Sequence, residues 1–392
     1  MLDVALKIII RRRVSPRPPS RILSLKQVVV FGDGAPSGMY RIPSLLRLPD
    51  GTLFALCEER LERADSGSVR VVARSSSDGG STWSALRIVA SGAEIGLEMA
   101  GATVGNPCCV YDAVRDRIVL LVTVNDGSAH ESAIWRGHAR RRRVFVLFSS
   151  DGGLEWSSPS EITSAVSEDD WTWYATGPGR AVQTEGGRLV FPCNHVRTFG
   201  GLLGSRFELR SHTVLSDDGE HFRKGGASPA AETNESTVAS VGGRLILNMR
   251  QVSGHGLRRL AASADGGESW QDEGHAESSS PPSRRATAPA PFPFTRVSHS
   301  RSQEQLSDPL PAGCHACLLA VPGGVLYSGP AGKASALGLG GSVARFWREE
   351  LYSLLRKKLS GRGHAKGSSA FWEGRHTLQL RFSPDGLDWA AP

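Results

Sequence analysis

Arginines and carboxylates stand at four places in strand-like sequence, and these are where chemistry is first expected. They occur in Tyr40-Arg41-Ile42-Pro43, in Cys57-Glu58-Glu59-Arg60 followed by Asp65, in Asn234-Glu235-Ser236-Thr237-Val238, and in Asn248-Met249-Arg250. Guanidinium groups bind carboxylates bidentately and keep their charge, and a carboxyl group with a suitable pKa transfers protons. A lone arginine on a strand is usually a surface residue, and an acidic loop beside a strand is usually solvated. The secondary-structure elements around these residues must therefore decide between a chemical role and a surface role.

A recurring turn motif indicates which elements position these residues. Three copies share the order Ser, Asp, Gly and Trp, a fourth is looser, and a fifth is one residue shorter. They are Ser76-x-Asp78-x-Gly80-x-Thr82-Trp83, Ser149-x-Asp151-x-Gly153-x-Glu155-Trp156, Ser263-x-Asp265-x-Gly267-x-Ser269-Trp270, Leu215-x-Asp217-x-Gly219-x-His221-Phe222 and Ser383-Pro-Asp385-Gly386-Leu-Asp-Trp389. In such a hairpin turn the Asp accepts backbone N–H groups, the Gly takes a positive φ and the aromatic ring covers the turn. One small antiparallel sheet per copy predicts an all-β propeller.

The spacing of the motifs predicts one domain with two insertions. Successive motif aspartates are 73, 66, 48 and 120 residues apart. The last interval contains a stretch rich in Ser, Pro and Arg and a predicted basic amphipathic helix over Ser342–Leu359. That helix could contact a membrane surface or a partner, although a solvated loop element is its commoner role. We expect a basic, disordered N-terminal extension, residues 1–26, and a propeller domain, residues 27–392, with insertions at about 278–305 and 334–373.

The net charge of +7 does not predict nucleic-acid binding, because the basic residues concentrate in residues 1–26, 278–305 and 342–366, outside the repeats. No apolar run approaches the length of a membrane span, and the apolar start precedes Arg11-Arg12-Arg13, the reverse of a secretory signal. The compartment stays open between cytoplasmic, membrane-associated and lysosomal. Six cysteines are predicted to be mostly buried free thiols. The isolated Cys314-His-Ala-Cys317 spacing predicts no metal and no other cofactor.

With these residues placed between the turn motifs, the chain resembles the animal and bacterial exo-α-sialidases, or neuraminidases, from about Met39 to Trp389 outside the two insertions. The resemblance implies a six-bladed β-propeller with Asp-box turns and a site at the centre of one face. There, three arginines from different blades clamp the carboxylate of sialic acid. It also implies hydrolysis, with retention, of terminal sialic acids on gangliosides, glycoproteins or oligosaccharides.

The resemblance assigns catalytic roles to two carboxylates. Asp65 is the general acid and base that protonates the leaving oxygen and then activates water. Such a group must be partly protonated, so a pKa raised by burial is expected for Asp65. Glu235 is the base that partners the nucleophile.

The substrate-binding residues follow by motif. Arg41 and Arg250 are the first two clamp arginines, and Arg60 contributes to the pocket. The third clamp arginine is expected at Arg375, on the premise that an insertion splits its motif. Weaker substrate contacts, for which a turn-forming role is nearly as good an interpretation, are Asn106, Tyr174 and Asn194.

The nucleophile that the resemblance implies is a tyrosine, because the carboxylate on the anomeric carbon would repel an anionic nucleophile. A neutral phenol needs a carboxylate base to activate it. None of the five tyrosines, Tyr40, Tyr111, Tyr174, Tyr327 and Tyr352, falls in the expected position. We therefore expect a C-terminally incomplete propeller, with one sheet edge unpaired and low turnover by this polypeptide alone.

Two other interpretations stay open at this point. A non-catalytic sialic-acid-binding propeller would keep the three clamp arginines without the nucleophile, and would bind a dehydrated sialic acid without hydrolysis. An unrelated Asp-box scaffold would lack the clamp, so Arg41→Ala would leave its ligand binding unchanged. The expected partner is a sialylated glycan and not a nucleic acid. Peripheral membrane contact and the oligomeric state are left open.

Overall fold

The computed structural model describes residues 6–10, 26–32, 39–62, 64–93, 95, 101–199, 206–252, 258–275, 317–321, 324–330 and 378–383. Within these ranges the protein has 23 strands and two short helices, α1 (Glu131–Trp135) and α2 (Thr163–Val166). The all-β prediction is therefore confirmed. Neither helix in the part described is long and apolar enough to cross a membrane.

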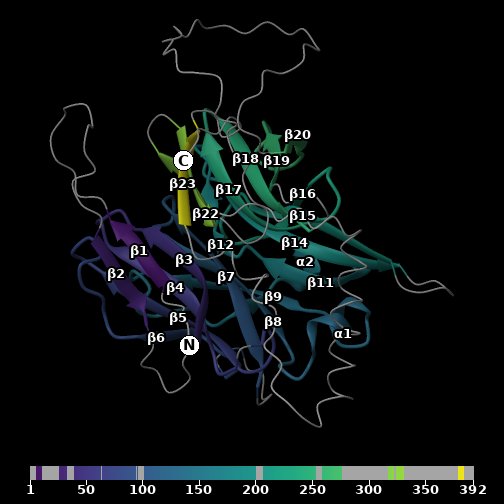
Figure 1. Cartoon of the computed structure of the whole chain (residues 1–392), viewed down its shortest axis with the longest axis horizontal. Helices are drawn as coiled ribbons and strands as arrows, with labels where there is room; N and C mark the ends of the chain where they lie inside the picture. The colour runs from purple at the N-terminus through teal and green to yellow at the C-terminus, as the bar shows by residue number, and fades with distance from the viewer. Residues whose placement is uncertain are drawn as a thin grey trace, which may run out of the picture.

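The strands form successive antiparallel units, which follow one another around the molecule from purple to yellow in Figure 1. Unit 1 comprises β3 (Met39–Arg47), β4 (Leu53–Arg60), β5 (Val69–Ser76) and β6 (Arg87–Ala90). Unit 2 comprises β7 (Thr103–Asp112), β8 (Arg117–Asn125), β9 (Arg143–Ser149) and β10 (Ser160–Glu161). A single parallel pairing between Val69 and Thr103 joins these two units into one sheet.

The later units repeat the design. Unit 3 comprises β11 (Trp171–Thr176), β13 (Val182–Gln183), β14 (Leu189–Phe199), β15 (Arg206–Ser216) and β16 (Arg223–Ala227). Unit 4 comprises β17 (Thr233–Val241), β18 (Arg244–Gln251), β19 (Arg258–Ser263) and β20 (Gln271–His275). Three strands of a fifth unit are described: β21 (Cys317–Val321), β22 (Gly324–Pro330) and β23 (Leu378–Ser383).

Two further pairings lie outside this series. The short strand β12 (Gly179–Arg180) runs parallel to β7. Strand β1 (Leu6–Ile10), inside the N-terminal stretch for which disorder is predicted, pairs with β2 (Lys26–Phe31), which begins at the end of that stretch. The β-branched run of three isoleucines in β1 suits a strand. The domain boundaries themselves stay a prediction.

The turn motifs occupy the same place in every unit. The strand before each turn, β5, β9, β15, β19 or β23, ends in the serine that opens the motif, and these serines are Ser76, Ser149, Ser216, Ser263 and Ser383. In the first turn, Asp78 Oδ1 accepts the backbone N–H groups of Ser81 and Thr82 at 2.8 and 3.0 Å. Gly80, at φ +85°, donates its N–H to Ser76 Oγ at 2.8 Å. The turns at Asp151 and Asp265 repeat these contacts, so the predicted turn chemistry is confirmed.

The looser fourth motif needs a correction. The predicted register put Asp217 at its centre, but Asp218 accepts the backbone N–H groups of Glu220 and His221 at 2.9 and 2.8 Å. This turn is therefore one residue shorter than the first three. Asp217 is drawn away because Arg188 and Arg223 pair with it at 2.5 and 3.1 Å. The fifth motif, beyond Ser383, lies outside the described residues.

Apolar side chains pack between neighbouring units, and the motif aromatics close these layers from the turn side. Trp156 packs between units 1 and 2, Phe222 between units 2 and 3, and Trp270 between units 3 and 4. Four of the six cysteines, Cys57, Cys108, Cys109 and Cys193, are buried and form no disulfide, as predicted.

Both predicted insertions, at about 278–305 and 334–373, lie outside the described residues. Pro330, the last residue of β22, pairs with Leu378, the first residue of β23. The chain therefore leaves the sheet after Pro330 and re-enters it at Leu378, and these two residues are paired partners on β22 and β23. The insertion at 334–373 stays a prediction.

Candidate functional site

A shift of register interrupts the first strand of each of the four complete units near its start. The shifts lie between Arg41 and Ser44, Gly105 and Cys108, Trp171 and Trp173, and Thr233 and Ser236. An extra residue bends a strand and re-aims its side chains. Two of these shifts hold non-glycine residues in left-handed conformation, Ile42 at φ +57° and Asn106 at φ +53°. Such conformations are uncommon, above all for a β-branched residue, and concentrate where function fixes the backbone.

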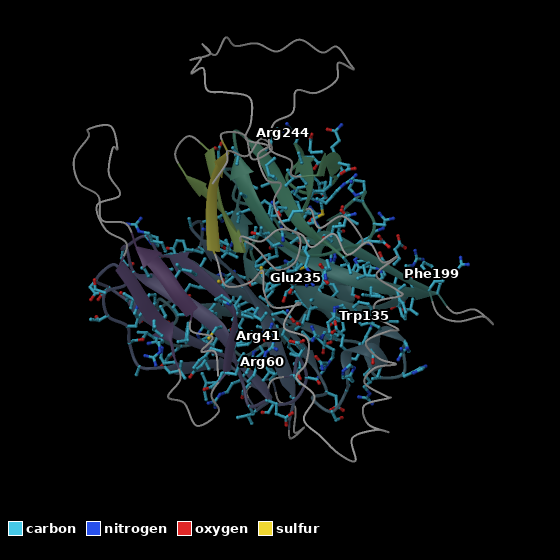
Figure 2. All side chains as sticks on the ribbon, viewed as in Figure 1. Arg41, Arg60, Trp135, Phe199, Glu235 and Arg244 are labelled. Carbon is cyan, nitrogen blue, oxygen red and sulfur yellow. The ribbon has the colours of Figure 1, made fainter. Side chains whose placement is uncertain are left out.

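Asp65 lies against two arginines of unit 1. Arg60 Nη1 donates to Asp65 Oδ1, and Arg41 Nη1 lies 3.4 Å from the same oxygen. Arg60 is buried, whereas 66% of the Asp65 side chain is exposed. The Asp65 carboxylate therefore faces solvent while the buried Arg60 guanidinium holds it. The structure thus brings together three residues that the sequence assigned to one site. In Figure 2, Arg41 and Arg60 lie in the middle of the view and Arg244 at the rim.

A buried carboxylate links this cluster to unit 2. Glu58 accepts from Arg60 Nε at 2.7 Å and from the backbone N–H of Asn106 at 2.7 Å. Gly105 makes room for that carboxylate, because a Cβ there would lie 2.5 Å from Glu58 Oε1. Asn106 therefore lies beside the Asp65 cluster, with its backbone N–H turned toward Glu58, and its substrate contact stays a prediction.

Unit 4 contributes a second ion pair. Arg250 Nη1 donates to Glu235 Oε2 at 2.8 Å, and both side chains are partly exposed. The two residues come from adjacent strands, because β17 pairs with β18.

Glu131, which the sequence reasoning missed, is coupled to both pairs. Loss of solvent, together with the negative charges of Asp65 and Glu235, raises the pKa of the Glu131 carboxyl against the opposing charges of Arg142 and Arg250. The position of Glu131 relative to the strands could have identified it from the sequence. Asp65, Glu131 and Arg250 each lie at or shortly after the end of the second strand of their unit, and these ends share one face.

The expectation of a raised pKa for Asp65 is wrong for this structure. Partial loss of solvent would raise the pKa, but the hydrogen bond and charge of Arg60 and the charges of Arg41 and Arg142 outweigh it. The pKa of Asp65 is therefore held below its ordinary 3.8. Burial alone would raise the pKa of Asp65, and the neighbouring arginine charges reverse that effect.

Two other predicted residues, Tyr174 and Asn194, are not brought to this cluster. Tyr174 is 2% exposed, and its hydroxyl lies 2.9 Å from His212 Nε2 between units 2 and 3. Asn194 is 4% exposed and its amide lies 3.5 Å from the carbonyl oxygen of Ala175. Neither presents its polar group to a ligand beside Asp65. Arg375 lies outside the described residues.

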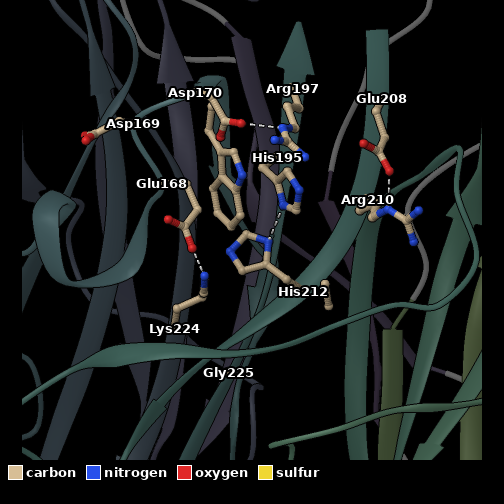
Figure 3. Close-up of a pocket in the computed structure, with 12 residues that line it drawn as sticks. Glu168, Asp169, Asp170, His195, Arg197, Glu208, Arg210, His212, Lys224 and Gly225 are labelled. Carbon is tan, nitrogen blue, oxygen red and sulfur yellow. Dashed lines mark hydrogen bonds and ion pairs between the residues drawn. The ribbon is translucent and has the colours of Figure 1, made fainter. Parts of the chain in front are cut away.

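A separate polar cavity of about 630 Å³ opens on unit 3 (Figure 3). Its floor is the Trp171 ring stacked on His195 at 3.6 Å between centroids, with His195 Nδ1 3.1 Å from His212 Nδ1. Its charged rim is internally paired, Glu168 with Lys224, Asp170 with Arg197 and Glu208 with Arg210. The cavity therefore leaves little unpaired charge for a ligand, and the Asp65 cluster is the stronger candidate site.

Repeated antiparallel units with Asp-box turns, and a charged site where their loops converge, define a β-propeller of the Asp-box class. A family model described as a BNR repeat-like domain matches residues 51–300, more than half of the sequence, and the chain belongs to this family.

The relatives with similar sequences are sialidases, which confirms the predicted resemblance. Sialidase-4 of Homo sapiens is 34% identical over 272 residues, covering 65% of this chain and 53% of that protein. The sialidase of Bacteroides fragilis is 30% identical over 250 residues, covering 60% and 44%. The chain thus spans about half the length of these relatives.

Solved structures agree on the fold. The chain matches the Hadza microbial sialidase Hz136 with a TM-score of 0.57 at 23% identity, covering 74% of this chain and 53% of that one. It matches Trypanosoma rangeli sialidase in complex with the inhibitor DANA with a TM-score of 0.55 at 17% identity, covering 84% and 49%. The propeller fold is thereby confirmed, while the number of blades stays a prediction.

Proposed function

We propose that the chain carries the sialic-acid site of an exo-α-sialidase, which hydrolyses terminal sialic acids of gangliosides, glycoproteins or oligosaccharides with retention. One observation carries the proposal. Arg41 from unit 1 and Arg250 from unit 4 reach a face where Asp65, Glu131 and Glu235 are electrostatically coupled. A pair of separated arginines beside acids suits a small anionic sugar better than a neutral one.

Arg41 and Arg250 would bind the carboxylate of the sugar, with Arg375 as the proposed third arginine. Arg41 is available for this role, because its contact with Asp65 is long, 3.4 Å, and its side chain is 32% exposed. Arg250 would have to share its guanidinium between Glu235 and the ligand. Planar guanidinium groups allow such sharing, since each carries five donors.

Asp65 would give its proton to the glycosidic oxygen and take one from water in the second step. Its low pKa in the free protein comes largely from its arginine neighbours. An anionic ligand on Arg41 would cancel part of that positive field and raise the pKa toward the range that acid catalysis needs. The exposed Asp65 carboxylate can reach such a ligand.

Glu235 would act as base toward a tyrosine nucleophile. The described tyrosine hydroxyls are engaged elsewhere: Tyr40 with Glu59, Tyr111 with Asp116 and Tyr174 with His212. Our proposal therefore assigns the nucleophile to none of these three.

The test is hydrolysis of a fluorogenic α-sialoside, with the anomeric configuration of the first product read by proton NMR. We expect the low turnover predicted for this polypeptide to release the α anomer first and to fall by at least about 100-fold in Asp65→Asn, the usual minimum for removal of a general acid. Equal rates for Asp65→Asn and the unsubstituted chain, or release of the β anomer first, would overturn the assignment.

A further inference from the structure

Arg142 is a buried cation in a run of four arginines, Arg140 to Arg143, that otherwise faces solvent. It is 6% exposed, whereas the side chains of Arg141 and Arg143 are each 38% exposed. Burial of a guanidinium group costs free energy unless the charge is compensated. Groups around Arg142 must therefore compensate its buried charge. The position of Arg142 in a run of arginines does not explain its burial.

Two contacts fix the Arg142 guanidinium. It lies over the Trp173 ring, 3.6 Å from the ring centroid, in cation–π geometry. Its Nη1 donates to Asn106 Oδ1 at 2.8 Å, an oxygen that Thr123 Oγ1 also approaches at 3.1 Å. Arg142 thus holds the side chain of a residue whose backbone is in left-handed conformation.

That residue begins a chain of hydrogen bonds that ends at Asp65. The Asn106 backbone N–H donates to Glu58, Glu58 accepts from Arg60, and Arg60 donates to Asp65. Asn106, Glu58 and Arg60 are buried or partly buried along this path. A displacement of Asn106 therefore shifts Glu58 and Arg60, and Arg60 is the hydrogen-bond donor that holds the Asp65 carboxylate.

We propose that Arg142 is a positioning residue of the site, which fixes the Asn106–Glu58–Arg60 chain and adds positive charge behind the Asp65 carboxylate. The inference rests on the proposed function, because it concerns the same site. Burial lowers the pKa of Arg142 to about 10, so the group stays charged at neutral pH.

Four charged groups act on the Asp65 carboxylate through their charge, and two of them, Arg41 and Arg60, contact it directly. They are Arg41 on β3, Arg60 on β4, Arg142 directly before β9, and Glu131 on α1. Loss of Arg142 removes one of three positive charges that favour the ionised form of Asp65, so it disfavours that form.

The test uses the full chain with carbon-13-labelled aspartate, and Asp65→Asn to assign the Asp65 carboxyl signal. In Arg142→Met we expect the Asp65 titration to move upward by about half a pH unit or more, and affinity for dehydrated sialic acid to fall by about tenfold. Arg142→Lys, which keeps the charge but not the planar fork, should restore the titration but not the affinity. Arg143→Met, the exposed neighbour paired with Glu161, is the control and should change neither.

Unchanged titration and unchanged affinity in a folded Arg142→Met would overturn the positioning role. If that variant does not fold, Arg142→Lys and Asn106→Gly, which keeps the left-handed backbone and removes the acceptor, decide through affinity. If the unsubstituted chain binds no dehydrated sialic acid, the proposed function fails. The Asp65 titration still reports on Arg142 in that case, so the two failures are distinguishable.

Discussion

Arg250 donates to Glu235 at 2.8 Å across the first two strands of unit 4. The guanidinium that is proposed to bind the ligand is therefore already paired in the free protein. A ligand carboxylate and Glu235 must share the Arg250 guanidinium. The negative charge of Glu235 sets how much free energy this sharing costs.

Glu235→Gln should separate binding from turnover. Removal of the charge frees Arg250 for the ligand, so we expect affinity for dehydrated sialic acid to stay the same or rise by a few fold. Hydrolysis should fall by at least about 100-fold, because the base is lost. Calorimetry and the fluorogenic assay measure the two effects. The control is Glu208→Gln, whose partner Arg210 lies in the separate cavity on unit 3. Weaker binding together with normal turnover in Glu235→Gln would contradict the assignment.

Gly105→Ala should damage the site through Glu58. The added Cβ would lie 2.5 Å from Glu58 Oε1, so the carboxylate must move, and with it the anchor of Arg60 and Asp65. We expect affinity for dehydrated sialic acid to fall by about tenfold or more, a loss of roughly 1.4 kcal/mol. Gly186→Ala, at an exposed turn where the nearest atom is 3.9 Å away, is the matched control. Equal affinity of the two variants for dehydrated sialic acid would show that Glu58 does not support the binding site.

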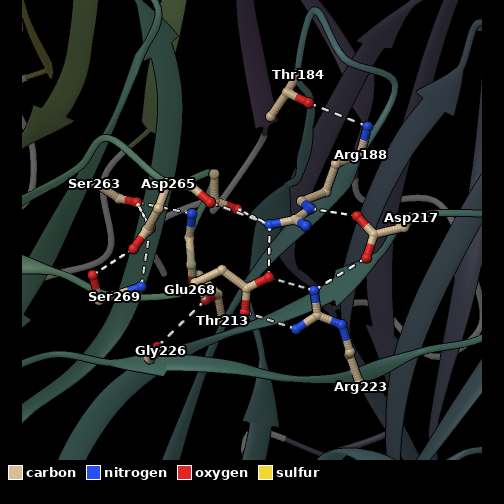
Figure 4. A network of polar contacts seen from close by, with 12 residues as sticks. Thr184, Arg188, Thr213, Asp217, Arg223, Gly226, Ser263, Asp265, Glu268 and Ser269 are labelled. Carbon is tan, nitrogen blue, oxygen red and sulfur yellow. Dashed lines mark hydrogen bonds and ion pairs between the residues drawn. The ribbon is translucent and has the colours of Figure 1, made fainter.

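Arg188→Met should weaken the junction between units 3 and 4. Figure 4 shows Arg188 and Arg223 alternating with Asp217 and Glu268. Arg188 pairs with these acids at 2.5 and 2.9 Å and donates to the carbonyl oxygen of Asp265 at 3.2 Å.

Because the network is partly exposed, we expect a loss of only about 1 kcal/mol, or roughly 2 to 4 °C in melting temperature. The difference should shrink in high salt, which screens exposed charges. Arg143→Met, which removes a single pair within unit 2, should cost less. A salt-independent loss would point to packing and not to charge.

The Asp-box carboxylates should make the fold sensitive to acid. Partial loss of solvent would raise the pKa of Asp265, but hydrogen bonds from Ser263 Oγ, Ser269 Oγ and the Ser269 N–H hold it well below 3.8. A carboxyl whose pKa is lowered by folding stabilises the protein above its unfolded pKa, and this stabilisation is lost as the pH falls through the folded value. The unfolding free energy should therefore decrease below pH 3.8.

Asp265→Asn should be less stable at neutral pH and should lose less of its remaining stability on acidification. Urea titrations at pH 7 and pH 3 measure both. Asp169→Asn, at a fully exposed position, is the control and should behave as the unsubstituted chain does. A parallel decline of both variants with pH would show that other carboxylates dominate.

The sequence predicted the fold through the local chemistry of its turns. Ser, Asp and Gly satisfy one another within a few residues, so the motif at Asp78 can be interpreted without knowledge of distant contacts. The exception is Asp217 next to Asp218, where two adjacent aspartates fit the pattern. Arg188 and Arg223, from elsewhere in unit 3, decide between them.

The site was predictable where one motif holds several of its residues. Arg41, Arg60 and Asp65 lie close in sequence, and Glu235 and Arg250 lie on paired strands. Glu131 and Arg142 escaped because their contacts cross between units and nothing local marks them. Arg142 in particular stands in a basic run that resembles a solvated surface. Its partner Asn106 is 36 residues away.

The measurement that tests the central claim most directly is calorimetric titration of the chain with dehydrated sialic acid, alongside Arg41→Met and Arg70→Met. Arg41 contacts Asp65 at the proposed site, whereas Arg70 pairs with Glu59 and is a matched arginine outside the proposed clamp. We predict binding by the unsubstituted chain, a loss of at least about 2 kcal/mol, roughly 30-fold, in Arg41→Met, and near-normal affinity in Arg70→Met. Absence of binding by the unsubstituted chain, or equal affinity in both variants, would contradict the account.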